Sequence, residues 1–308
     1  MAVEMFPQAN ADVGYYGLPV LKKPVWSWEV PVYFFVGGAA GAASVIAVIS
    51  EWLDGDETIA RDAAWIAAGG SMVSAALLTG DLGRPERFIN MLRVFKPQSA
   101  MSVGSWTLAA FSTLSAASAF ASAMERRLGG WMPLRIVHQV AAPAAATVGT
   151  VMSTYTGVLI GATAIPAWNT NVDVLPLHFG ASGVASAVGL LELLGHEDDA
   201  LQFLGIAAAA VETATGMVIE FGRGEESSPL RDGPSGWLTR AGGVLSGPVP
   251  LALRALAWRR PHVRRAAAAS ALAGSLLTRL AWIAAGRVSA RDPAIPLALP
   301  AATGVSLL

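Results

Sequence analysis

The chain has 308 residues, of which 54% are hydrophobic and only 14% are charged. An average soluble domain carries about 25% charged residues, so this composition excludes an ordinary soluble enzyme, and the net charge of −1 gives no sign of nucleic-acid binding. The sequence has no cysteine, which excludes thiolate-held iron–sulfur clusters, cysteine-ligated zinc and disulfides from anything the chain does alone.

The first part of the chain, residues 1–29, is expected to lie outside the membrane. Three prolines and two lysines interrupt it, so it has no continuous apolar core of the kind that a cleaved signal peptide needs. Trp26 and Trp28 near its end suit the aromatic belt at a membrane–water interface. We therefore expect an extramembrane N-terminal segment that leads into the first membrane helix.

Apolar stretches fill most of the remaining chain. A helix needs about 20 mostly apolar residues to cross the hydrocarbon layer, and eight stretches of about this length occur, near 30–50, 63–80, 100–123, 138–162, 174–194, 201–220, 238–257 and 266–286. The sequence therefore predicts an all-α integral membrane protein with eight transmembrane helices over residues 30–286. We expect two four-helix bundles, 30–162 and 174–286, followed by a C-terminal tail, 287–308.

The predicted spans are rich in small residues rather than leucine. Examples are GGAAGAAS at 37–44 and AAPAAATVGT at 141–150. Because lipid removes the hydrophobic drive for helix association, small residues that let backbones approach closely are typical of packed membrane helices. The sequence thus predicts tightly packed helices.

The chemically densest region lies between the second and third predicted spans. Residues 81–106 read DLGRPERFINMLRVFKPQSAMSVGSW, and Asp81, Arg84, Glu86 and Arg87 place both charge signs beside the membrane surface. One interpretation is a polar mouth that holds a ligand head group or docks a partner, with Asp81 and Glu86 available for proton transfer. The other is an interfacial loop of weak charge pairs that anchors helix ends.

This segment resembles the signature of the NrfD family, the quinone-interacting membrane subunits of polysulfide reductase and related enzymes. Further stretches resemble the family in the same order, namely WSWEVPVYFFVGGAAG (26–41), YTGVLIGATAIPAWN (155–169), LPLHFGASGVASAVGLLELL (175–194) and LLTRLAWIAAG (276–286). The resemblance extends over nearly the whole chain. Its most specific part is the segment from Asp81 to Phe88.

The resemblance implies a membrane anchor that binds menaquinone or ubiquinone and lies, as a multi-pass protein, in the bacterial cytoplasmic (inner) membrane. Electrons would pass to or from a ferredoxin-like subunit with [4Fe–4S] clusters, which contacts a catalytic subunit, often a molybdopterin enzyme. The absence of cysteine agrees with this division, because every cluster must then reside on a partner. We expect neither haem nor an iron–sulfur cluster on this chain.

The resemblance also suggests which residues meet the quinone. Tyr155 matches a position whose phenol donates a hydrogen bond to a quinone carbonyl, although the same phenol could make an interhelical hydrogen bond. In the first helix the family's polar contacts are replaced by Val30 and Tyr33, so Glu29 could serve as proton acceptor. The expected quinone-binding residues are Trp28, Tyr33, Asp81, Arg84, Arg87 and Tyr155, and the expected proton-transfer residues are Glu29, Asp81 and Glu86.

Several ionisable residues fall inside the predicted spans, where burial of a charge costs at least about 2.5–3.5 kcal/mol. Arg279 matches an arginine of the family's last helix, and we expect it to face the bundle interior and to pair with a carboxylate or with helix-end carbonyls. Glu212 lies near the centre of a span, so Glu212 and Arg279 are candidates for a proton relay. Glu192, Glu220 and Arg254 are explained more simply by side chains that reach out to the interface at helix ends.

A haem cofactor and two other functions are the alternatives. A haem would need paired axial ligands, but His138 and His178 are expected on opposite sides of the membrane. Buried Arg279 and Glu212 would also suit a transporter or an ion- or proton-conducting subunit. A pure membrane anchor without quinone chemistry is the third possibility.

Overall fold

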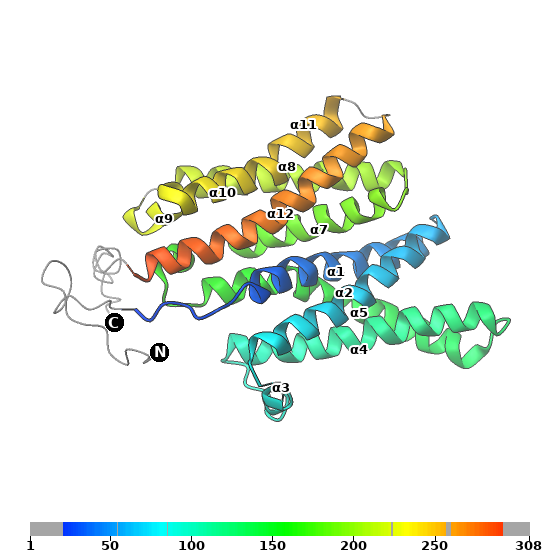
Figure 1. Cartoon of the computed structure of the whole chain (residues 1–308). Helices are drawn as coiled ribbons and strands as arrows, with labels where there is room; N and C mark the ends of the chain where they lie inside the picture. Colours follow the sequence, from blue (N-terminus) through cyan, green and yellow to red (C-terminus); the bar gives the residue numbers. More distant parts are fainter. Residues whose placement is uncertain (1–20, 54, 85, 223, 257–259, 292–308) are drawn as a thin grey trace, which may run out of the picture.

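The computed structural model describes residues 21–53, 55–84, 86–222, 224–256 and 260–291, and within these ranges the chain is helical, without strands. Figure 1 shows the long helices running roughly side by side. The helices are α1 (Glu29–Trp52), α2 (Glu57–Asp81), α3 (Glu86–Met91), α4 (Ala100–Arg127), α5 (Met132–Gly161), α6 (Pro166–Asn169), α7 (Leu175–Leu193), α8 (Asp199–Phe221), η2 (Glu225–Ser227), α9 (Ser228–Arg231), α10 (Gly233–Ser246), α11 (Pro248–Leu256) and α12 (Pro261–Ser289).

The helices form two sets by their mutual contacts. In the first set, α1 packs on α2 and α5, and α4 packs on α5 and α2; in the second, α12 packs on α7, α10 and α11, and α8 packs on α7 and α11. Helix α7 also packs against α1 and α5, which joins the two sets. The short helices α3 and α9 lie at the same end of the molecule as the beginning of α1 and the end of α12 (Figure 1).

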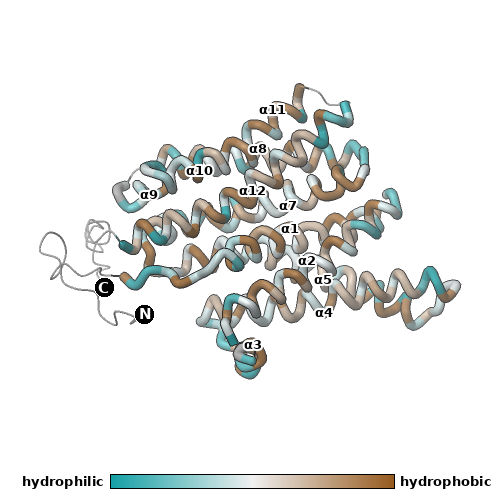
Figure 2. Tube along the Cα trace, viewed as in Figure 1, coloured by the Kyte–Doolittle hydropathy of each residue, from teal (hydrophilic) through white to brown (hydrophobic). Residues whose placement is uncertain are grey.

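Six helices are long and apolar enough to cross a membrane, namely α1, α2, α4, α5, α8 and α12. Hydrophilic residues gather toward the helix ends and around α3, whereas the middle parts are mostly apolar (Figure 2). The prediction of an all-helical membrane fold is therefore confirmed. Helix α7 runs alongside these six with 19 residues.

The region predicted as a span at 238–257 is not one continuous helix, because two helices occupy it. Helix α10 ends at Ser246 and α11 begins at Pro248. A proline has no backbone N–H and its ring collides with the preceding turn, so it interrupts a helix interior. The hydrophobicity of the stretch gave no indication of this break.

Small residues allow very close helix crossings, as the sequence predicts. A Cβ atom on Gly149 of α5 would lie 2.7 Å from the backbone oxygen of Gly41 in α1, and a Cβ atom on Gly183 of α7 would lie 2.8 Å from that of Gly38. Real Cβ atoms essentially never approach oxygen this closely. Helix α1 therefore contacts both α5 and α7 backbone to backbone.

A buried ion pair joins helices of the second set. Arg254 of α11 donates hydrogen bonds of 2.7 Å to each carboxylate oxygen of Glu192 in α7, and one of 2.8 Å to the side-chain oxygen of Gln202 in α8. Both charged side chains are 1% exposed. The interpretation of Glu192 and Arg254 as helix-end residues that reach the interface is therefore wrong, because they neutralise each other inside the protein.

Glu220 behaves as the sequence predicts. It pairs with Arg240 at 2.6 Å, and the two side chains are 31% and 45% exposed. This pair lies at the surface between α8 and α10.

Candidate functional site

A small cavity lies where the beginning of α1 meets the ends of α2 and α5, α3 and the beginning of α4. It has a volume of about 70 Å³. Tyr33, Asp81 and Tyr155, which are separated widely in the sequence, all line it. The remaining lining is mostly apolar and aromatic, including Trp26, Phe34, Leu78, Met91 and Met101.

Tyr155 is held by the beginning of α4. Its hydroxyl donates a hydrogen bond to the backbone oxygen of Ala100, and a Cβ atom on Gly104 would overlap its ring. The ring is therefore accommodated because residue 104 has no side chain. The phenol thus makes an interhelical hydrogen bond, which was the alternative to a contact with a ligand. A ligand would have to compete with the backbone oxygen of Ala100 for the phenol proton.

Asp81 connects the N-terminal segment to the end of α2. Its carboxylate accepts a hydrogen bond of 3.3 Å from the backbone N–H of Ser27 and another from the Ser27 hydroxyl. Asp81 is half-buried at the edge of the cavity. It thus combines access to solvent with contact to the cavity, which is what a proton-transfer group requires.

An aromatic wall joins this cavity to the second helix set. Trp26 stacks on Trp168 with ring centroids 5.2 Å apart and an interplanar angle of 13°, and meets Phe34 edge-on at 6.0 Å. Trp168 is fully buried and its indole N–H donates to the backbone oxygen of Trp282 at 2.7 Å. The position of Trp26 therefore depends on α6 and α12, although it precedes α1 in the sequence.

Four other expected site residues, Trp28, Glu29, Arg84 and Glu86, do not line the cavity. Trp28 is 64% exposed, and Arg84 and Glu86 are exposed beside α3. Glu29 is the first residue of α1, and one of its carboxylate oxygens is buried without a hydrogen-bond partner in the described structure. The side chain of Arg87 lies outside what the structure describes.

Some cavity residues escaped the sequence analysis. Gly104, Ser105 and Met101 lie at the beginning of α4, and Met91 ends α3. The only signal in the sequence was their place in or directly after the charged segment, which does not say which side chains turn inward.

Arg279 is completely buried in α12, as expected, but no carboxylate pairs with it within the described chain. It donates hydrogen bonds to the Ser182 hydroxyl at 2.9 Å and to the backbone oxygen of Phe179 at 3.0 Å. Its guanidinium carbon lies 4.0 Å from the centre of the Phe179 ring. Hydrogen bonds and a cation–π contact therefore stabilise this charge. Glu212 in α8 is also buried.

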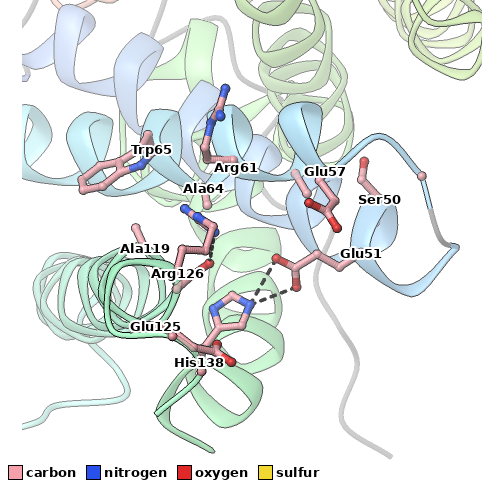
Figure 3. A pocket seen from close by; sticks show the side chains of 15 residues that line it. Ser50, Glu51, Glu57, Arg61, Ala64, Trp65, Ala119, Glu125, Arg126 and His138 are labelled. Carbon is pink, nitrogen blue, oxygen red and sulfur yellow. Dashed lines mark hydrogen bonds and ion pairs between the residues drawn. The ribbon is translucent and has the colours of Figure 1, made fainter. Parts of the chain in front are cut away.

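A polar pocket of about 670 Å³ lies at the opposite end of the first helix set. Figure 3 shows His138 of α5 directed at Glu51 of α1, with Arg61 and Arg126 above them. The His138 Nε2 atom lies 3.2 Å from each carboxylate oxygen of Glu51. His138 thus lies near one end of the molecule, whereas His178 lies near the beginning of α7 at the other. No cluster of three or more histidine, aspartate or glutamate residues suited to a metal occurs in the described ranges.

Comparison with known proteins identifies the family. The family described as "Polysulphide reductase, NrfD" matches residues 20–196, which is more than half of the chain. The chain belongs to the NrfD family. Six apolar helices and this membership make it a multi-pass integral membrane protein.

One named relative is similar to part of the chain. The C subunit of the polysulfide reductase of Wolinella succinogenes is 29% identical over 190 residues, which is 56% of this chain and 58% of the relative. The NrfD match contains α1 to α7, and with them Tyr33, Asp81 and Tyr155, whereas Glu212 and Arg279 lie beyond it.

Proposed function

We propose that this NrfD-family protein is the quinone-reactive membrane subunit of a respiratory oxidoreductase. It would exchange electrons and protons between the membrane quinone pool and an iron–sulfur partner subunit. The observation that carries the proposal is the meeting of Tyr33, Asp81 and Tyr155 in one cavity within the range that matches the family.

The residues around this cavity suit a quinone head group. The Tyr155 phenol can donate a hydrogen bond to a quinone carbonyl, Trp26 and Phe34 offer aromatic surfaces, and Asp81 can hold a proton at the edge. A bound quinone supplies the chemistry of two-electron, two-proton transfer. Ligand pockets usually measure about 300–1,000 Å³, so a ring would enter the 70 Å³ cavity only if Tyr155 leaves Ala100 or α3 moves outward.

The charged residues around α3 and at the start of α1 are proposed for the approach to the cavity. Arg84 and Arg87 would attract the ligand or the partner, and Glu29 and Glu86 would carry protons between Asp81 and solvent. Trp28, which is exposed at the surface, would contact the ligand as it approaches the cavity or would lie at the membrane interface.

The proposed architecture has eight membrane spans. In it α7 and the interrupted pair α10–α11 cross the membrane together with the six apolar helices, giving two four-helix bundles over 30–162 and 174–286. Glu212 and Arg279 of the second bundle are the proposed proton-relay groups.

The relative's name supports an assembly of several subunits, because it designates one lettered component of a polysulfide reductase. We propose that a ferredoxin-like [4Fe–4S] subunit docks near α3 and contacts a catalytic subunit, such as a molybdopterin enzyme. The quinone would be menaquinone or ubiquinone, and the membrane the bacterial cytoplasmic membrane.

The substitution Tyr155→Phe tests the quinone site. In the purified complex, the affinity for a quinone analogue is expected to fall by up to about tenfold, because one neutral hydrogen bond contributes about 0.5–1.5 kcal/mol. Isothermal titration calorimetry measures this change. The control Thr150→Val removes an exposed hydroxyl from the same helix and should leave the affinity unchanged.

Unchanged affinity in both Tyr155→Phe and Asp81→Asn would refute the site. Absence of any quinone from the purified complex would instead favour a pure anchor. Ion flux in liposomes without a redox partner would favour a transporter.

A further inference from the structure

A second, larger cavity lies in the C-terminal half, between α8, α10 and α12. Its volume is about 460 Å³, and its lining is mainly apolar. This lies within the usual range of ligand pockets, about 300–1,000 Å³. Helix α10 rests chiefly on α12, so its packing against α8 is left incomplete. The cavity is separate from the one around Tyr155, and no residue lines both.

The cavity contains an unpaired buried carboxylate. Glu212 of α8 is 2% exposed, and neither of its carboxylate oxygens has a hydrogen-bond partner in the described structure. It lies nine residues before the end of α8, which is about 14 Å along the helix axis. A buried polar group without a partner is costly, so this side chain indicates a ligand that donates a hydrogen bond.

A histidine faces the same space. His178 of α7 is 3% exposed and lines the cavity. Its Nδ1 atom shares a hydrogen bond of 2.8 Å with the Thr215 hydroxyl, which fixes the ring and leaves Nε2 without a partner among the described residues. The cavity wall is thus mainly apolar but carries the buried Glu212 carboxyl and His178 imidazole, besides three threonines and the Glu220–Arg240 pair.

The opposite side of the cavity is open and apolar. Met217 and Val244 line it and are both 50% exposed, and Phe221 is 76% exposed. These exposed apolar side chains belong to α8 and α10, so in the proposed eight-span arrangement a ligand would enter from the hydrocarbon layer. The Glu220–Arg240 ion pair borders the same opening, nearer the end of α8.

These features restrict the chemistry of the occupant. A phosphate head group would bury its own charge against the apolar wall, and an acyl tail would leave the Glu212 carboxyl without a hydrogen-bond partner. A neutral, lipid-soluble ring with a hydroxyl group satisfies both the apolar wall and the carboxylate. We propose that this cavity is a second binding site, specific for a quinol-type molecule whose hydroxyl donates to Glu212.

Two glycines provide the test. Gly216 and Gly243 line the cavity, and a Cβ atom on either would meet no atom within 4 Å. Gly243→Leu therefore fills the cavity without collision at Cβ. The matched control is Gly69→Leu on the exposed face of α2, where a Cβ also meets nothing.

The experiment is a fluorescence-quenching titration of the purified complex with the quinol analogue 2-heptyl-4-hydroxyquinoline N-oxide. Wild type and Gly69→Leu are expected to bind two equivalents, and Gly243→Leu one. Glu212→Leu should weaken the affected site by up to about tenfold, because one hydrogen bond contributes about 0.5–1.5 kcal/mol.

The outcomes separate this inference from the proposed function. If wild type binds one equivalent, and Gly243→Leu leaves this binding intact while Tyr155→Phe weakens it, the second site is overturned and the first is retained. If wild type binds one equivalent, and Gly243→Leu abolishes this binding while Tyr155→Phe leaves it intact, the site in the C-terminal half is retained and the Tyr155 site is overturned. A phospholipid that mass spectrometry finds bound to wild type and lost in Gly243→Leu would overturn the quinol assignment.

Discussion

Replacing Arg254 by alanine is expected to lower the free energy of unfolding by about 3–5 kcal/mol. The substitution leaves Glu192, which is 1% exposed, without its two hydrogen bonds of 2.7 Å. Arg264 lies 3.6 Å away and compensates only in part. Gly205 makes room for the guanidinium, since a Cβ there would lie 2.6 Å from its central carbon, so the variant also leaves a void.

The measurement is unfolding of the purified protein in mild detergent, followed by circular dichroism against denaturant. Arg240→Ala is the matched control, because it breaks an ion pair of similar length whose side chains are 45% and 31% exposed. Exposed pairs contribute about 0–1 kcal/mol. Equal effects of the two substitutions would contradict the view that burial makes the Glu192–Arg254 pair important.

Gly286→Ala is expected to destabilise the protein by about 1–3 kcal/mol, the usual cost of overpacking. A Cβ atom at this position of α12 would overlap the indole ring of Trp168. Because Trp168 stacks on Trp26, the displacement should also weaken binding of a quinone analogue at the Tyr155 cavity. Thermal unfolding and the binding titration measure the two effects.

The control is the same substitution in an open place. At Gly69 in α2 a Cβ meets no atom within 4 Å, so Gly69→Ala should stabilise the helix by about 0.5–1 kcal/mol. The two Gly→Ala changes are thus expected to have opposite signs. A gain in stability for Gly286→Ala would show that the Trp168 ring can move without cost.

The helical membrane fold could be predicted because it depends on composition and local periodicity. Long apolar stretches must form helices in lipid, where every backbone polar group needs an internal partner. The break between α10 and α11 was missed because hydropathy takes no account of the N–H that Pro248 lacks. Glu192 and Arg254 were misread for a related reason, since no pattern within one helix shows that a partner of opposite charge lies on another.

The candidate site was predictable only in part. The charged segment after Asp81 pointed to the end of the molecule that holds the cavity, and Tyr155 was identified through resemblance. The sequence did not indicate that Trp26 rather than Trp28 turns toward the cavity, because both suit a membrane interface equally well.

The sequence by itself determined the class of protein, the absence of thiolate-held clusters and the residues that can carry protons or bind a ring. These follow from composition and from the chemistry of side chains. Only the tertiary structure decided which of them meet, because Tyr33, Asp81 and Tyr155 converge through the crossing of α1, α2 and α5. It also showed that the Glu212 carboxyl is buried without a hydrogen-bond partner among the described residues, since burial and hydrogen bonding depend on what neighbouring helices place around a side chain.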